Sequence, residues 1–206
     1  MSLNATRKNV QLIRELERQF SLDAGCGKGV YLRYFKHPVV GLDVSRKRIK
    51  FAKSKYSQRI FYVVGDIRSL PFKSKVFDYL FSVDVIEHLN ETGIDSAFSE
   101  FERVTTGIVH VSTPNCNYLQ ELLRKITGAS LFDTEHMSKM KEDDPHKHKS
   151  SLTEKRLEQY GFQVNGCLGW VTAQIINIGF VNTCYDLLVW RHPRLAGSLI
   201  GTKKCV

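Results

Sequence analysis

The sequence predicts an α/β fold: one doubly wound sheet of about seven strands, mostly parallel, with one antiparallel edge strand. Short apolar runs alternate with helical patterns over roughly residues 20–127, and two further apolar runs come late in the chain. Alternating strands and helices join by right-handed crossovers, which place helices on both faces of a parallel sheet. Ligands in such sheets bind beyond the carboxyl ends of the strands, so we look for the site at that edge.

Length and composition fit a single soluble domain spanning residues 1–206. The chain is long enough for a full core, and 42% hydrophobic with 25% charged residues is ordinary for a globular protein. The five cysteines are scattered and include no CxxC pair. This usage is typical of a reducing compartment and argues against a disulfide framework or a zinc ribbon. With no signal-peptide pattern at residue 1, we expect a cytoplasmic protein.

The net charge of +9 permits contact with nucleic acid or anionic lipid through phosphate groups. Much of this charge lies between residues 46 and 55, on one predicted helix. A basic run on a helix is usually a solvated face, and that is the preferred interpretation here.

The chain up to residue 112 supplies five predicted strands and three predicted helices. Apolar residues at helical spacing predict a helix over about residues 7–19, and Ser45 is a candidate N-cap for a helix to about Tyr56. An apolar stripe from Ile94 to Val104 predicts a third helix. The predicted strands are a short buried run that leads into a glycine-rich turn and the runs 39–43, 60–64, 77–83 and 108–112.

The last third contains two predicted insertions. A helix over 119–126 is followed by a polar insertion at about 128–150, and Ser151–Glu154 matches a capping box that opens another helix. An apolar helical insertion at about 169–195 lies between two strands, 162–168 and 198–206, which we expect to pair antiparallel at the sheet edge. Its core, 170–190, has the length of a membrane span, but four polar residues interrupt it. A cap over the substrate, a dimer face or a membrane-surface contact is preferred.

The residues 22–29 place three glycines two positions apart, directly after a predicted strand and before a helical pattern. Glycine permits positive φ and lets a ligand lie against the backbone. A helix beginning behind the turn would offer N–H groups to a carboxylate or phosphate. Three acids, Asp43, Asp66 and Asp84, follow the next predicted strands. They should therefore meet the glycine turn at one edge of the sheet.

These motifs resemble a class I S-adenosylmethionine-dependent methyltransferase with a Rossmann-like fold, in the small-molecule, type 11-like branch. The run Leu22–Gly29 is similar to the family's LDxGCGxG motif, and Gly65–Phe72 to its GDxxxLPF segment. Phe77-Asp78 together with Glu87-His88-Leu89 resembles the FD…EHL signature. No NPPY or DPPY sequence, typical of amino-directed nucleic-acid methyltransferases, follows the fourth strand. Cys116 lacks the surroundings of a cytosine C5 nucleophile.

The resemblance implies S-adenosylmethionine as the cofactor. Asp23 would accept from its amino group, Asp43 from its ribose hydroxyls and Asp66 from its adenine amino group. Asp84 would face the sulfonium. The implied cofactor-binding set is Asp23, Gly25, Cys26, Gly27, Gly29, Asp43, Val44, Asp66, Ile67 and Asp84.

A hydroxyl acceptor also needs a general base, and histidine has a suitable pKa. The candidates are His88, His136, His146 and His148, of which the last two precede the predicted capping box. For each of them an exposed or structural role is the competing interpretation. Combined with Glu87 or Glu135, these histidines form no recognised ligand set, so we expect no metal site.

The expected function is methyl transfer to a small or lipid-linked acceptor, at oxygen in preference to nitrogen or carbon. The apolar segment 168–190 favours a hydrophobic, quinone-like or isoprenoid-linked acceptor and leaves peripheral membrane contact open. Two alternatives remain: an RNA methyltransferase, suggested by the charge, and a non-catalytic cofactor-binding protein. The oligomeric state is not predicted.

Overall fold

The computed structural model describes residues 3–18, 20–56, 59–115, 149–150, 152–167, 191 and 198–205. The chain divides into two compact units, which we describe separately. The glycine-turn unit comprises Asn9–Ile86, Glu91–Val111 and Thr202–Val206. The second unit comprises Met1–Lys8, Glu87–Asn90 and Ser112–Gly201. Most of the two predicted insertions, and the predicted helix 119–126, lie outside the described residues.

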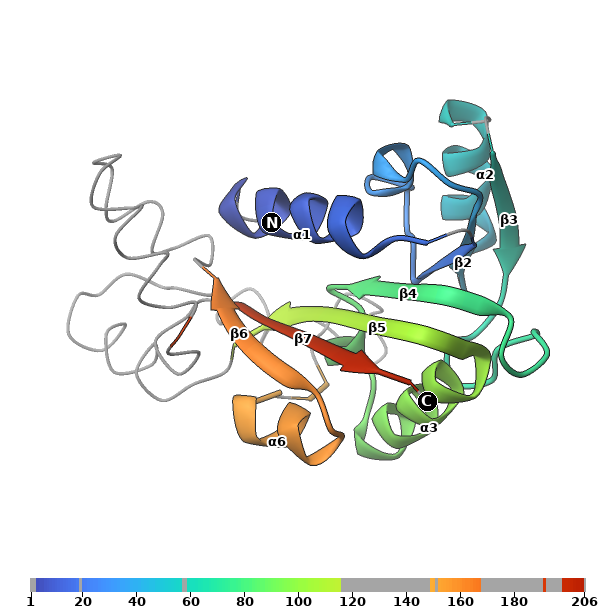
Figure 1. The fold of residues 1–206 in the computed structure, drawn as a ribbon. Coiled ribbons are helices and arrows are strands. Elements are labelled where there is room, and N and C mark those ends of the chain that lie inside the picture. The colour runs from blue at the N-terminus through green and yellow to red at the C-terminus, as the bar shows by residue number, and fades with distance from the viewer. Residues whose placement is uncertain are drawn as a thin grey trace, which may run out of the picture. The chain divides into compact units, whose positions relative to one another are not determined.

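Seven strands form one sheet in the order β3-β2-β1-β4-β5-β7-β6. Strand β1 pairs in parallel with β2 and β4, and β2 pairs in parallel with β3. Figure 1 shows β7 running opposite to the part of β5 beside it, and opposite to β6. The predicted mostly parallel sheet with an antiparallel pair at its edge is confirmed, with the reversed strand one place inside that edge. The strands are β1 (Ser21–Ala24), β2 (Val39–Asp43), β3 (Ile60–Val64), β4 (Phe77–Val83), β5 (Thr105–Pro114), β6 (Gln163–Cys167) and β7 (Ser198–Lys204).

The described helices are α1 (Leu3–Leu16), α2 (Arg46–Lys55), α3 (Glu91–Val104) and α6 (Glu154–Gln159). In Figure 1, α1 and α3 lie on opposite sides of β4, so helices cover both faces of the glycine-turn unit's sheet. The Ser45 hydroxyl accepts a hydrogen bond from the Arg48 N–H at 3.4 Å, which confirms the predicted N-cap of α2. The side chains of Ile49 and Ala52 are buried, whereas most of the basic residues of α2 are exposed. The preferred reading of that basic run as a solvated face is confirmed.

One face of β4 forms the centre of the glycine-turn unit. Tyr79 and Phe81 are fully buried and pack with Ile13 of α1. Behind them, His110 Nδ1 lies 2.9 Å from the Tyr79 hydroxyl and its Nε2 lies 3.1 Å from Asn9 Oδ1. Burial lowers the pKa of His110 to about 3, so the imidazole stays neutral and structural.

Two local expectations are wrong. The glycine turn leads into a single turn of 3-10 helix, η1 (Leu32–Tyr34), and not into an α-helix. Phe35 is already extended, and Pro38 disfavours helical backbone at the residue before it, so the chain turns directly into β2. The N-cap of α6 is Thr153 and not Ser151, because the Thr153 hydroxyl accepts from the Arg156 N–H at 3.3 Å.

Within the described residues, no helix is long and apolar enough to cross a membrane. The segment 170–190, whose length prompted the question, lies outside those residues.

Candidate functional site

Side chains pack closely against the glycine turn at Gly25 and Gly29 but not at Gly27. Gly25, Gly27 and Gly29 all have positive φ, at 88°, 55° and 79°. A Cβ added at Gly25 would lie 2.4 Å from a methyl carbon of Val85, far inside contact distance. A Cβ added at Gly29 would lie 3.1 Å from side-chain carbons of both Leu32 and Tyr56. A Cβ at Gly27 would meet no atom within 4 Å, so the turn is open there.

Asp43, at the carboxyl end of β2, is bonded to this turn. Its Oδ2 accepts from the Gly27 N–H at 2.9 Å and its Oδ1 accepts from the Ser45 N–H at 2.8 Å. The N–H groups of Gly25 and Cys26 donate to the Leu42 carbonyl at 2.7 and 2.9 Å. The Gly29 N–H donates to the Cys26 carbonyl at 2.9 Å, so four N–H groups of the turn are used inside the protein, which differs from the expectation that they face a ligand carboxylate.

Asp23 is a buried acid with an unused oxygen. It is 3% exposed, and its Oδ2 has no hydrogen-bond partner. Burial, and to a lesser extent the charge of Asp43, raises the pKa of Asp23 to about 8. The carboxyl is therefore mainly protonated at neutral pH. A buried oxygen without a partner is costly, and a cationic donor placed against it would relieve that cost.

Asp66 lies at the same edge of the sheet as Asp43, but its carboxylate is already paired. The Gly65 N–H donates to the Asp43 carbonyl at 3.2 Å, which holds the end of β3 beside the end of β2. The Arg68 Nε lies 3.0 Å from both carboxylate oxygens of Asp66. This guanidinium lowers the pKa of Asp66. Sequence reasoning missed Arg68, although a cation two residues after an acid at a strand end was the available signal.

Asp84 follows β4 in a left-handed conformation, with φ of 53°. Burial raises the pKa of Asp84 to about 6. A non-glycine residue with positive φ is uncommon, and such strain clusters at functional positions. Ile67 and Cys26 are buried, whereas Val44 is 71% exposed beside the turn. All ten sequence-predicted cofactor residues belong to the glycine-turn unit.

Of the histidine candidates, only His88 lies within the described residues, in η2 (Ile86–His88). His136, His146 and His148, together with Glu135 and Cys116, lie outside them. In the second unit, the N–H groups of Lys149 and Ser150 donate to the Glu87 carbonyl at 2.8 and 3.2 Å. The chain that directly follows His146 and His148 is therefore fixed beside the residue preceding His88.

Comparison with known proteins agrees with this arrangement. Residues 22–107 match the family described as "Methyltransferase domain". A malonyl-[acyl-carrier protein] O-methyltransferase from Hamiltonella defensa is 30% identical over 118 residues, covering 55% of this chain and 45% of that protein. A ubiquinone biosynthesis O-methyltransferase from Pelagibacter ubique is 29% identical, covering 69% of this chain and 65% of that protein. The chain thus spans about half to two thirds of the length of these curated relatives.

Solved structures share the fold. The magnesium protoporphyrin IX methyltransferase of Synechocystis, with bound SAH, has a TM-score of 0.62 at 18% identity, covering 98% of this chain and 81% of that one. Residues 22–107 therefore belong to the methyltransferase domain family, and the fold is shared with S-adenosylmethionine-dependent methyltransferases of known structure.

Proposed function

We propose that this chain transfers the methyl group of S-adenosylmethionine to a small or lipid-linked acceptor, at oxygen. The observation that carries the proposal is Asp43, which joins the end of β2 to a glycine turn that is open at Gly27. A positively charged sulfonium makes the donor's methyl carbon electrophilic, so transfer is an in-line displacement that needs alignment more than covalent catalysis.

The fit of the donor rests on two buried acids. The partnerless oxygen of Asp23 suits a cationic amino group, and meeting that charge would lower the raised pKa of Asp23. The carboxylate of Asp43 retains acceptor capacity beyond its two backbone N–H donors, and ribose hydroxyls would use it. Asp66 would accept from the adenine amino group only if its Arg68 partner shifts, and Asp84 would face the sulfonium.

Oxygen is the proposed acceptor atom because two relatives of this chain carry O-methyltransferase in their names. A hydroxyl acceptor must lose its proton as the new carbon–oxygen bond forms, whereas a carboxylate acceptor carries none to lose. His88, His146 and His148 are the proposed bases for a hydroxyl, supported by the hydrogen bonds that hold Lys149 and Ser150 to the Glu87 carbonyl.

The first test is cofactor binding by isothermal titration calorimetry with S-adenosylhomocysteine. Asp43→Asn should weaken binding by about a hundredfold, since the variant loses a charged acceptor shared by the turn and the ribose. Asp78→Asn is the matched control, because Asp78 lies at the amino end of β4 and its carboxylate accepts from the Phe20 N–H at 3.1 Å. Equal affinities of Asp43→Asn and the wild type would show that the donor does not bind at Asp43.

The second test is turnover, measured as S-adenosylhomocysteine release with malonyl-acyl-carrier protein or an isoprenoid-linked quinol as acceptor. Release with either one supports the proposal. Cofactor binding without release on any acceptor would favour the non-catalytic alternative. The exposed cations of α2 are the observation that supports the alternative of an RNA methyltransferase. RNA binding that falls steeply with salt, together with methylated RNA, would favour it.

A further inference from the structure

A pocket lies at the other end of the strands, away from the acids of the candidate donor site. It has a volume of about 460 Å³ and includes Val39 and Ile60, the first residues of β2 and β3. Lys55 and Tyr56, at the end of α2, also line it. Since Asp43 and Asp66 follow the opposite ends of the same two strands, this pocket is separate from the candidate donor site. All of it belongs to the glycine-turn unit.

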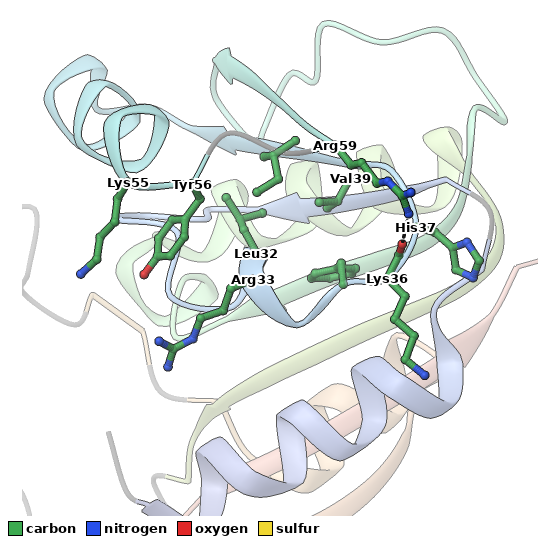
Figure 2. A pocket seen from close by; sticks show the side chains of 10 residues that line it. Leu32, Arg33, Lys36, His37, Val39, Lys55, Tyr56 and Arg59 are labelled. Atoms are coloured by element: carbon green, nitrogen blue, oxygen red, sulfur yellow. Dashed lines mark hydrogen bonds between the residues drawn. The ribbon is translucent and has the colours of Figure 1, made fainter.

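The rim of the pocket is cationic. Figure 2 shows Arg33, Lys55 and the Tyr56 ring toward one end, and Lys36, His37 and Arg59 toward the other. All four Arg and Lys side chains are exposed, and none of the described residues that line the pocket is an acid. Within the described part of the chain, none of these four side chains forms an ion pair. A cleft lined by one sign of charge focuses the field and concentrates ions of the opposite sign.

Four of the residues that line the pocket are apolar and form its floor. Leu32 and Val39 are each 1% exposed, so the apolar surface open to a ligand comes mainly from the half-buried Phe35 and Ile60. Phe35 packs edge-on against Phe81 in the core. A flat or apolar group placed on this floor would remove from water the face that lies against it. The pocket's size is within the usual range for small-molecule sites, roughly 300–1,000 Å³.

The cationic end at Lys36 is held in place by two contacts. The Arg59 guanidinium donates to the Lys36 carbonyl at 3.3 Å, and the Lys36 N–H donates to the buried Glu17 carboxylate at 2.8 Å. Arg59 itself has φ of 58°, in the left-handed region that arginine rarely adopts. Strain of this kind persists where surrounding structure enforces it, and it is common at ligand sites.

We propose that this pocket binds a small organic phosphate, with its apolar or aromatic part on the floor and its phosphate among the rim cations. The proposal does not depend on methyl transfer. Arg and Lys are the side chains that bind phosphate oxygens best. A small ligand is favoured over an RNA strand because the cations surround a bounded apolar floor and do not follow a continuous groove.

The test uses 1-naphthyl phosphate as the probe, with inorganic phosphate and 1-naphthol as probes of each part alone. All titrations contain saturating S-adenosylhomocysteine, so that the donor site is filled. Naphthyl phosphate should bind at least about tenfold more tightly than inorganic phosphate, because part of its ring leaves water. It should also bind more tightly than naphthol, which lacks the charge.

Two double variants separate the pocket from general charge. Lys36→Gln/Arg59→Gln should weaken naphthyl phosphate binding by about tenfold or more, through loss of charge-assisted hydrogen bonds. Lys50→Gln/Lys53→Gln removes the same charge from the exposed face of α2, outside the pocket, and should change the affinity by less than about twofold. Both variants should bind S-adenosylhomocysteine as the wild type does, which shows that they fold.

Several results would overturn the proposal. Equal weakening by the two double variants would mean diffuse attraction, and naphthyl phosphate no tighter than phosphate would mean that the floor is unused. Binding of a single-stranded RNA oligomer, or of vesicles of phosphatidylcholine and phosphatidic acid, without binding of naphthyl phosphate would assign the cations to an extended polyanion.

Discussion

The two ends of strands β2 and β3 differ in the sign and the burial of the charged side chains near them. At the carboxyl ends, Asp43 of β2 is 5% exposed and bonded to backbone N–H groups, and Asp23 of the neighbouring β1 is 3% exposed. At the amino ends, Lys36 and Arg59 stand exposed around a pocket with no acid among the described residues that line it. Buried acids are thus characteristic of the carboxyl ends, whereas exposed cations gather at the amino ends.

This difference bears on how each end could bind a ligand. Buried acids act in a low dielectric and are positioned before a ligand arrives, so each contact should be strong and insensitive to salt. Exposed cations are screened by water and salt, so each should contribute less and lose effect as salt rises. The following changes test this contrast, from the largest expected effect to the smallest.

Gly25→Ala should lower the free energy of unfolding by about 2–5 kcal/mol, through left-handed backbone strain and overpacking against Val85. Gly27→Ala is the control, because it carries the same kind of strain but meets no atom within 4 Å. It should cost only about 1–2 kcal/mol and yet obstruct donor binding. Urea unfolding measures both variants, and equal losses would contradict the packing described for the turn.

Asp23→Asn should abolish proton release on donor binding at pH 7. With a pKa of about 8, Asp23 is protonated in the free protein, and a cationic donor group would ionise it. Wild-type affinity should therefore rise with pH up to about 8 and then level off. Calorimetry in buffers of different ionisation enthalpy measures a release approaching about one proton in the wild type.

The same raised pKa predicts the stability of the free protein. A neutral buried Asp23 contributes stability that is fully present below the unfolded pKa of about 4 and is lost as pH rises through about 8. Asp23→Asn should lack that loss. Parallel pH profiles for the two proteins would show that Asp23 is ionised in the free state.

Arg68→Ala should tighten donor binding by about threefold. In this variant the Asp66 carboxylate would not have to release Arg68 before it accepts from the donor's adenine amino group. Asp66→Ala, by contrast, should weaken binding. Calorimetry with S-adenosylhomocysteine measures both. Weaker binding by Arg68→Ala would mean that the guanidinium itself contacts the donor.

Lys36→Gln/Arg59→Gln should raise Tm by about one degree at low salt, as repulsion among the rim cations is relieved. The gain should disappear at high salt, where exposed charges are screened. Differential scanning calorimetry at two salt concentrations measures it. A gain that persists at high salt would have a cause other than charge.

Most strand positions were predictable because each strand is a short apolar run bounded by a turn or an acid. β2, β3 and β4 match their predicted ranges residue for residue. The antiparallel pairing of β6 and β7, predicted for the apolar runs 162–168 and 198–206, is also confirmed. The missing α-helix after the glycine turn was harder to foresee, because its apolar spacing is helical while Pro38 leaves too little chain to continue it.

The site was predictable in position but not in electrostatics. Strand ends placed Asp43 beside the glycines, whereas the raised pKa of Asp23 and the pairing of Asp66 with Arg68 depend on burial and rotamers. The cationic pocket escaped sequence reasoning for another reason. Its rim combines side chains from the segments 33–37, 55–56 and 59–60, which share no motif.

Leu32 and Tyr56 lie between the cationic pocket and the glycine turn. They line the cationic pocket, and both also lie against Gly29 of the turn. A ligand that displaced either side chain would change the room behind Gly29, and so the donor's affinity. Coupling free energies are reciprocal, so the donor would alter the pocket's affinity by the same factor. Through this shared wall, a phosphate metabolite could act as an effector of methyl-donor binding without touching any acid.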